Sequence, residues 1–530
     1  MYLQNSSLFQ LLFKRITTTF EMIWIATSSY TSFGIIFAKC LCYKLIKMKK
    51  LTLVSCLMAC VLSFQNCARN PVTGKSQVVL MSEKQEIAMG QEADPQIVAQ
   101  FGLYQDKALQ DFIMQKGKQL AAISHRPNLD YQFKIVDSDV LNAFAIPGGY
   151  VYFTRGIMAH FNNEAQFAGV LGHETGHITA RHSVAQQRNA LLGQLGIIAG
   201  VVINPNLAQF AETASQGLGL LFLKFGRDAE RQADELGVEY SSKIGYDAKE
   251  MADFFITLER KGAESGAAEL PEFLSTHPNP GDRNVTVTKL AAEWKQKLNL
   301  TNPIVNRNIY LQRIEGLVYG EDPRQGYIEN NVFYHPELRF QFPTPQGWKY
   351  QNTPQRVQFA PKDGKALLMM MGAQGNNLQE AANAVLQQNN LQVLDSKQLT
   401  VNGLPAIAMV ADPKPQQGQQ PQPIRVLSYL IQYGNTIYLF LGVSATTDFN
   451  QFTPFFTNTM EGFRQVTDQS KLNKKPERIH IKTVAGNTTL EQALRSFSVP
   501  ANRFEELAIV NGMKLTDRVT AGTMIKIIGL

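Results

Sequence analysis

The stretch HETGHITARH, from His173 to His182, decides how the rest of this 530-residue sequence is interpreted. Its first five residues form the pattern HExxH. On a helix, the four-residue spacing places the imidazoles of His173 and His177 about 40° apart on one face, where both can bind a single Zn²⁺. Glu174 then lies beside the metal-bound water, where a carboxylate can act as general base. The motif therefore predicts a catalytic site with one zinc ion per chain.

A catalytic zinc needs a third protein ligand and an open fourth position, and the sequence FGRDAERQADELG offers the ligand. Glu230 and Asp234 lie four residues apart on a predicted helix. Glu230 would bind the zinc, and Asp234 would be an outer carboxylate that fixes an imidazole N–H. The alternative is an exposed acidic helix face paired with Arg227 and Arg231, which the HExxH motif upstream disfavours.

Local signals support a helix around the motif. Asn163 is a good N-cap, and Glu164 falls in the first turn, where a carboxylate is favoured. His182 lies nine residues after His173, so a helix of about 100° per residue would turn it to the opposite face. We therefore do not expect His182 to reach the metal. Before the helix, Pro147-Gly148-Gly149 predicts a turn in an extended stretch.

Charge and cysteine content exclude several classes of protein. The net charge is +7, but residues 1–66 carry seven basic side chains and one acid, so the remainder is nearly neutral. A nucleic-acid binder would carry its basic excess on the folded part, which excludes that partner. All five cysteines lie within the first 67 residues, which excludes a disulfide framework or a cysteine nucleophile after that point.

The N-terminal segment has the pattern of a secretory leader. Met48-Lys49-Lys50 precedes an apolar run that is too short to span a bilayer and that ends at Cys67. We interpret Met48 as the true start; a transmembrane helix around residues 20–45 is the alternative for the upstream part. A cysteine that closes such a run indicates a lipoprotein, so Cys67 is the predicted lipidation site, with Cys60 as the alternative.

The periodicity of apolar residues changes along the chain. Residues 83–300 follow a helical period, within which Ala190–Ile203 is predicted to be a buried helix. Alternating strand patterns begin at residue 331, with a low-complexity loop at 413–423. A third unit runs from 477 to 530.

Five motifs, in order, resemble one family of zinc metallopeptidases: CARNPVTG, NAFAIPGGYVYFTRG, HETGHITARH, RDAERQADELG and STHPNPGDR. This is the HExxH family that includes HtpX, the CAAX prenyl endopeptidases and BepA, and the lipoprotein or periplasmic members are the most alike. The resemblance covers roughly Cys67 to Leu300.

The resemblance implies a gluzincin fold, with His173, His177 and Glu230 as ligands and Glu174 as base. It also implies that Asn142–Ile146 is a cleft edge that pairs with an extended substrate, and it supports Cys67 as the lipidated residue. The cleft residues are Asn142, Ala143, Phe144 and Ala145.

The expected architecture is therefore multidomain. A mainly α, gluzincin-type metallopeptidase domain with a small sheet is followed by an α/β sandwich-like domain and a βααβ module that weakly resembles LysM, a glycan-binding unit. The expected segments are a leader (1–66), a lipid tether (67–82), the peptidase domain (83–300), a connector (301–330), an α/β domain of unknown role (331–467) and the LysM-like module (477–530).

The expected function is a zinc-dependent endopeptidase of the bacterial cell envelope, lipid-anchored at the periplasmic face of the outer membrane. Its substrates would be misfolded or stalled envelope proteins. The alternative is a mostly latched peptidase that serves as a chaperone or binding scaffold for outer-membrane assembly or peptidoglycan.

His277, in the loop Ser275-Thr276-His277-Pro278, is the candidate for such a latch. Its neutral imidazole could occupy zinc's open position. The alternative is a hydrogen bond to the substrate or to the developing oxyanion. The family resemblance implies the latch, and it matches Arg283 to the basic residue that follows, expected here to contact substrate.

Overall fold

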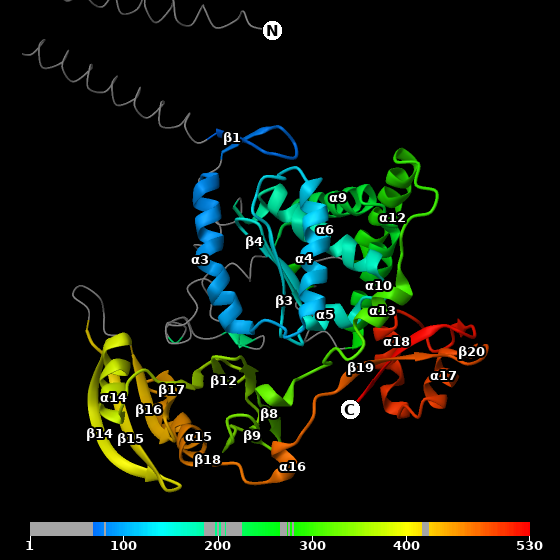
Figure 1. The fold of residues 1–530 in the computed structure, drawn as a ribbon. Coiled ribbons are helices and arrows are strands. Elements are labelled where there is room, and N and C mark those ends of the chain that lie inside the picture. The colour runs from blue at the N-terminus through cyan, green and yellow to red at the C-terminus, as the bar shows by residue number, and fades with distance from the viewer. Residues whose placement is uncertain are drawn as a thin grey trace, which may run out of the picture. The chain divides into compact units, whose positions relative to one another are not determined.

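The structure is a computed structural model, shown as a ribbon in Figure 1. It describes residues 67–78, 81–184, 197–198, 201–202, 207, 225–264, 273, 276–277, 280–415 and 423–530. The predicted leader, Met48, Cys60 and the possible span at 20–45 lie outside these residues. Within the described part of the chain, no helix is both long and apolar enough to cross a bilayer.

The predicted tether contains a short hairpin. Strand β1 (Cys67–Arg69) pairs antiparallel with β2 (Ser76–Val78), and Cys67 lies opposite Val78. The turn between them is stabilised by Asn70, whose side-chain oxygen accepts hydrogen bonds from the backbone N–H groups of Val72 and Thr73. The predicted lipidation site is thus the first residue of an ordered strand.

The first half of the helical region surrounds a three-stranded sheet. Its strands have the order β3-β5-β4, so β4 is an edge strand, antiparallel to β5. Gly148 and Gly149 both have positive φ, which confirms the turn predicted between β4 and β5. The elements are α3 (Glu83–Phe101), α4 (Lys107–Ala122), β3 (Gln132–Val136), β4 (Ala143–Ile146), β5 (Tyr150–Thr154), α5 (Arg155–His160) and α6 (Glu164–Thr179).

Helix α6 carries the HExxH motif and begins as predicted. The side chain of Asn163 accepts a hydrogen bond from the backbone N–H of Gln166, and Glu164 lies in the first turn. Every residue of α6 is buried. A surface helix would have one polar face, so α6 is the central element of this domain.

Helix α9 (Arg227–Lys243) packs closely against α6 through a pair of glycines. A Cβ added to Gly172 would lie 3.0 Å from the carbonyl oxygen of Gly237, and one added to Gly237 would lie 3.0 Å from the backbone N of His173. The missing side chains therefore let the two backbones approach. This contact brings the HExxH residues next to the acidic residues of α9. Helices α10 (Lys249–Glu264) and α12 (Pro280–Lys297) complete the bundle.

One predicted helix is wrong where the structure describes it. Within Ala190–Ile203, Ile197–Ile198 and Val201–Val202 form the antiparallel pair of short strands β6 and β7. β-Branched residues suit a strand as well as a buried helix, and an apolar run of this length does not distinguish the two.

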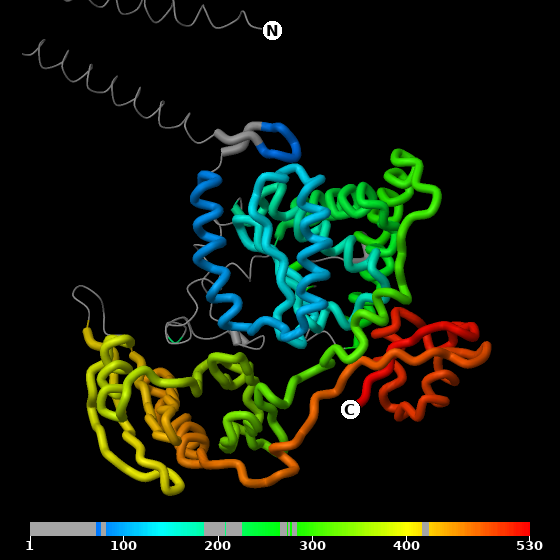
Figure 2. Tube along the Cα trace, viewed as in Figure 1, coloured from blue at the N-terminus to red at the C-terminus, as the bar shows by residue number. Residues whose placement is uncertain are grey.

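The C-terminal segment packs into the same core as these helices. Two strands, β19 and β20, precede the helices α17 and α18, and two more, β21 and β22, follow them, so the expected βααβ order has one additional short strand on each side. The outer strands β19 and β22 pair antiparallel and belong to the orange and red C-terminal part of the tube in Figure 2. The expected connector also contributes to this core, through Tyr310 and Leu311 of α13 (Arg307–Arg313). The C-terminal elements are β19 (Arg478–Thr483), β20 (Thr488–Thr489), α17 (Leu490–Ser496), η3 (Ala501–Arg503), α18 (Phe504–Val510), β21 (Arg518–Val519) and β22 (Met524–Gly529).

Residues 327–466, which lie between these parts in the sequence, form the sheet domain. Its seven-stranded antiparallel sheet has the order β11-β12-β13-β17-β16-β15-β14. Helix α14 (Leu378–Gln388) packs with one apolar core and α15 (Phe449–Glu461) with the other. The strands are β11 (Lys349–Asn352), β12 (Arg356–Ala360), β13 (Ala366–Gly372), β14 (Leu391–Val401), β15 (Leu404–Pro413), β16 (Ile424–Tyr433) and β17 (Thr436–Ala445).

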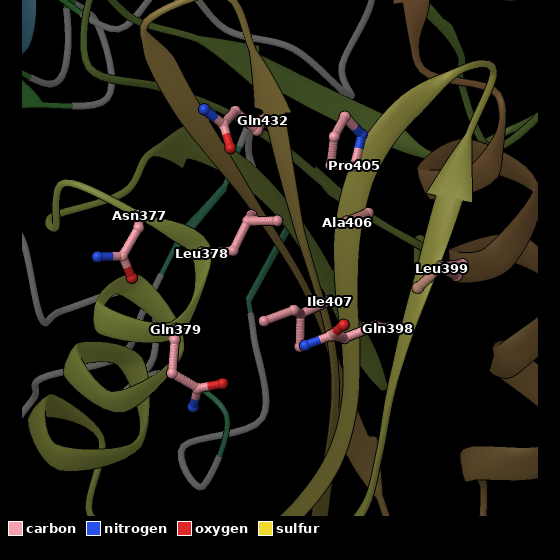
Figure 3. A pocket seen from close by; sticks show the side chains of 9 residues that line it. All are labelled: Asn377, Leu378, Gln379, Gln398, Leu399, Pro405, Ala406, Ile407 and Gln432. Atoms are coloured by element: carbon pink, nitrogen blue, oxygen red, sulfur yellow. The ribbon is translucent and has the colours of Figure 1, made fainter.

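A smaller sheet, of order β18-β10-β9-β8, accompanies it. It is built from β8 (Tyr327–Glu329), β9 (Val332–His335), β10 (Phe340–Pro343) and β18 (Arg464–Gln465), and the short helices η2 (Pro323–Gln325) and α16 (Gln469–Leu472) flank it in sequence. A pocket of about 360 Å³ opens between α14 and the large sheet, and no charged side chain lines it (Figure 3). The possible metal-binding residues lie elsewhere, on and beside α6.

Candidate active site

Four side chains converge at one point: two from α6, one from α9, and His277, which precedes α12 in the sequence. Each of His173, His177, Glu230 and His277 contributes one donor atom, and the four atoms lie within 4.8 Å of one another. His173 and His177 are one turn apart on α6, and Glu230 lies in the first turn of α9. All four side chains are buried. The structure thus brings the three predicted ligands and the predicted latch together.

The spacing of these atoms suits a tetrahedral cation. The Nε2 atoms of His173 and His177 are 3.0 Å apart, and His277 Nδ1 lies 3.3 Å from His173 Nε2 and 2.9 Å from Glu230 Oε1. His177 Nε2 lies 3.4 Å from the same Glu230 oxygen. A tetrahedral zinc with bonds of about 2.0–2.1 Å separates its ligands by about 3.3–3.4 Å. Two imidazole nitrogens and a carboxylate oxygen are also the donor types that zinc prefers, so the residues fit the ion.

The outer nitrogen of His173 is held by a carboxylate. Its Nδ1 lies 2.9 Å from Asp234 Oδ1, and Arg283 donates to both oxygens of Asp234 at 2.7 and 2.8 Å. Arg283 also lies 3.2 Å from Glu230 Oε2. Although burial alone would raise the pKa of Asp234, the Arg283 guanidinium holds it below its usual value. Asp234 therefore stays ionised and can fix the tautomer of His173.

We expected Arg283 to contact substrate, but in the structure its guanidinium contacts Asp234 and the predicted ligand Glu230. It is buried, and its guanidinium stacks over the ring of Phe255 at 4.3 Å. These contacts support a positioning role for Arg283, and a substrate contact stays a prediction.

His182 lies against His177, and the expectation that it points away is wrong. Its Nδ1 is 3.0 Å from His177 Nδ1, and its Nε2 is 2.9 Å from Gln232 Oε1. Helix α6 ends at Thr179, so the helical angle that places residues within a helix no longer applies at His182. Phe225 also stacks on His177, with ring centroids 4.0 Å apart. The sequence analysis did not select Phe225 or Gln232 as site residues. The one signal for them is that both lie near the predicted ligand Glu230, in the stretch FGRDAERQADELG.

Glu174 is fully buried beside this cluster. Its carboxylate oxygens have no hydrogen-bond partner among the described residues, and His277 Nε2 lies 3.7 Å from Oε1. Burial raises the pKa of Glu174 above its usual value, with the nearby imidazoles opposing the shift. A carboxylate without hydrogen bonds and with a raised pKa is suited to accept a proton.

Two neighbouring carboxylates favour a positive charge on His277. Burial opposes a charge on His277, yet Glu230 and Glu174 together raise its pKa above the usual value. Burial likewise opposes the charge of Glu230, but His277 and His177 hold the pKa of Glu230 well below its usual value. Glu230 is therefore an anionic donor.

The predicted cleft edge is strand β4. Ala143, Phe144 and Ala145 belong to it, and Asn142 precedes it with its side-chain oxygen buried and unpaired among the described residues. Phe144 packs against Tyr152, with centroids 5.0 Å apart. The position of β4 at the sheet edge is compatible with substrate pairing, which stays a prediction because all four of its residues are buried here.

Comparison with known families adds to this geometry. Residues 107–291 match the family described as peptidase family M48, and this match contains α6, α9 and the HExxH motif. Over these residues the chain is similar to the M48 peptidases. The M48 match also includes His277 and Arg283, but neither the sheet domain nor the C-terminal segment.

Curated relatives show the same region of similarity. The chain is 30% identical over 267 residues to a beta-barrel assembly-enhancing protease of Yersinia pestis, covering 48% of this chain and 52% of the relative. It is 30% identical over 189 residues to the mitochondrial metalloendopeptidase OMA1 of Arabidopsis thaliana, covering 34% of this chain and 36% of that one. The chain thus spans about half the length, or less, of the curated relatives it matches.

The solved structures add no argument. The Ran-binding protein Mog1p of Saccharomyces cerevisiae matches 27% of this chain and 99% of its own with 10% identity, at a TM-score of 0.22. The LysM-like resemblance of residues 477–530 receives no support from these comparisons.

Proposed function

We propose that the chain is a zinc-dependent endopeptidase of the bacterial cell envelope. One observation carries the proposal: four donor atoms at tetrahedral spacing lie beside a buried carboxylate, Glu174, that has no hydrogen-bond partner among the described residues. His173, His177 and Glu230 would hold the ion. A bound Zn²⁺ would act as a Lewis acid on the scissile carbonyl and make a water molecule easier to deprotonate. Glu174 would accept that proton and deliver it to the leaving amine.

The control of this activity would rest with His277. Its Nδ1 lies 3.3 Å from His173 Nε2 and 2.9 Å from Glu230 Oε1, so it would be a fourth donor to a bound ion in place of a water molecule. Both His277 and Glu174 are buried. Substrate hydrolysis would therefore require His277 to leave. A role for His277 as a hydrogen-bond donor to the substrate is the alternative, and it predicts the opposite effect of removing the side chain.

The closed site favours a second candidate function. A peptidase whose metal is covered by His277 would spend most of its time inactive, so that the sheet domain and C-terminal segment could act as a binding scaffold. Peptidoglycan or an outer-membrane protein under assembly would be the partner of such a scaffold. The name of the Yersinia pestis relative, which refers to beta-barrel assembly, agrees with a substrate or partner of this type.

Location in the cell envelope would depend on a lipid attached to Cys67. This residue is the first of β1, which is followed by the turn at Asn70. Labelling cells with a clickable fatty acid tests this assignment. We expect Cys67→Ser to abolish the label and Cys60→Ser to keep it; a Cys67→Ser protein that still labels would contradict it.

Casein cleavage by the full chain tests the proposed activity. We expect wild type to cleave and Glu174→Gln to lose activity while keeping its zinc, because glutamine cannot accept the proton. His277→Ala should raise basal cleavage with zinc retained. Loss of cleavage in His277→Ala would assign it a substrate-binding role, and equal cleavage by Glu174→Gln would rule out the mechanism.

A further inference from the structure

The ring of His182 lies between the ligand His177 and the side chain of Gln232. Its Nδ1 is 3.0 Å from His177 Nδ1 and its Nε2 is 2.9 Å from Gln232 Oε1. His182 is 8% exposed, so water does not replace these contacts freely. Gln232 is two residues beyond the ligand Glu230 on α9, and this chain of contacts therefore joins the two ligand-bearing helices.

The backbone is bent to bring His182 into this position. After the end of α6, Arg181 has a φ of 59°, in the left-handed region that side chains other than glycine rarely adopt. Such a backbone conformation is strained and persists where its surroundings hold it. The Nε of Arg181 donates to the buried carboxylate of Glu86 at 2.9 Å, and its guanidinium also donates to the Met81 carbonyl at 3.0 Å. The chain changes direction at Arg181, and this turn brings His182 into contact with His177.

The direction of each hydrogen bond follows from the chemistry of its end groups. The Gln232 Oε1 can accept but not donate, so His182 carries its proton on Nε2. The Nδ1 of neutral His182 is then an acceptor, and His177 must donate to it from Nδ1. The remaining nitrogen of His177, Nε2, keeps its lone pair and faces His173 Nε2 and Glu230. This is the protonation state in which an imidazole binds a metal.

We propose that His182 is a positioning residue, supported by Gln232, that fixes His177 in its zinc-binding tautomer and orientation. This role rests on the proposed zinc site and deepens it. The two ligand histidines would then be held by different chemistry, since His173 donates to the ionised carboxylate of Asp234 and His177 donates to a neutral imidazole.

A purely packing role for His182 makes a different prediction. Phe225 covers the ring of His177, and the centroids of His182 and Phe225 are 6.2 Å apart, so an aromatic ring at position 182 would also fill space. His182→Phe keeps a ring but has no acceptor. His182→Asn loses the ring but can place an amide oxygen near the position of the imidazole Nδ1. The two variants therefore separate hydrogen bonding from packing.

The measurement is the zinc affinity of the full chain, determined by competition with a chromophoric chelator. We expect His182→Phe to weaken zinc binding by about 10- to 100-fold, as loss of an outer partner does, and His182→Asn to stay within about threefold of wild type. Gln232→Leu should give a smaller loss than His182→Phe. His335→Phe, in the sheet domain, is the control and should match wild type.

Each outcome decides the proposal. Zinc affinity that is unchanged in His182→Phe, or lowered equally in His182→Phe and His182→Asn, would overturn the positioning role while leaving the zinc site intact. A wild-type chain that binds no zinc would instead refute the proposed function, and the positioning role with it. Wild-type binding with loss in the phenylalanine variant and recovery in the asparagine variant would establish it.

Discussion

The two segments that follow the peptidase helices differ in how they are held. The C-terminal segment, 478–529, shares one continuous apolar core with α4, α6 and α10. Its Lys526 is fully buried, and the Nζ donates to the carbonyl oxygens of Ala159 and Phe161 at 2.8 and 3.0 Å. The sheet domain, 327–466, instead forms two apolar cores of its own. Among the described residues, Leu207 is the one member of these cores that lies outside the sheet domain. A segment with the element order of a separate module can therefore be part of the catalytic domain's folding unit.

The largest expected effect comes from deleting residues 477–530. The deletion would expose the apolar surface of α5, α10 and α13 that this segment covers, and it would remove the hydrogen bond from Arg260 to the Met513 carbonyl. We expect the truncated chain to lose cooperative folding of the peptidase domain, measured by circular dichroism on heating and by limited proteolysis. A truncated chain with a wild-type melting temperature would show that the segment is an independent module.

A matched pair of core substitutions sharpens the comparison. Leu507 and Leu430 are both fully buried, the first in the C-terminal segment and the second in the sheet domain. Truncation to alanine should cost about 2–5 kcal/mol of unfolding free energy in each case. We expect Leu507→Ala to accelerate hydrogen exchange in α6, and Leu430→Ala to accelerate it in the sheet domain alone. Faster exchange of α6 in Leu430→Ala would contradict the separation of the sheet-domain cores from the core that contains α6.

The buried Lys526 also predicts a pH dependence of stability. Burial holds the pKa of Lys526 well below its usual value, so the folded state binds fewer protons than the unfolded state between that lowered pKa and about pH 10.4. Stability from this group must therefore increase as the pH rises, by at most about 1.4 kcal/mol per pH unit. Denaturant unfolding at several pH values between 7 and 10 should show this slope in wild type relative to Lys526→Met. Parallel profiles of the two proteins would contradict a lowered pKa for the buried Lys526.

Local sequence signals predicted the parts of the site that lie within regular elements. The Asn163 cap and the HExxH spacing describe α6 correctly, and the four-residue step from Glu230 to Asp234 places both on the inner face of α9. A helical period extrapolated past the end of α6 misplaced His182, because one left-handed residue, Arg181, redirects the chain. A period holds only as long as the element continues.

Contacts between distant segments left no signal in the sequence. The apolar pattern of 477–530 indicates buried faces but does not say whether they bury against each other or against α10 and α13. The same holds for Arg283, whose sequence neighbours give no sign of its bonds to Asp234, 49 residues away. Such pairings depend on tertiary structure, and the structure was needed to find them.

X-ray absorption at the zinc edge of the purified full chain tests the proposed zinc site. We expect a four-coordinate ion with nitrogen and oxygen ligands, three of them imidazoles in the resting protein, from His173, His177 and His277. In His277→Ala the count should fall to two imidazoles, with zinc retained and an oxygen ligand in place of the third. An unchanged imidazole count in His277→Ala, or zinc that does not require Glu230, would contradict the assignment of the site.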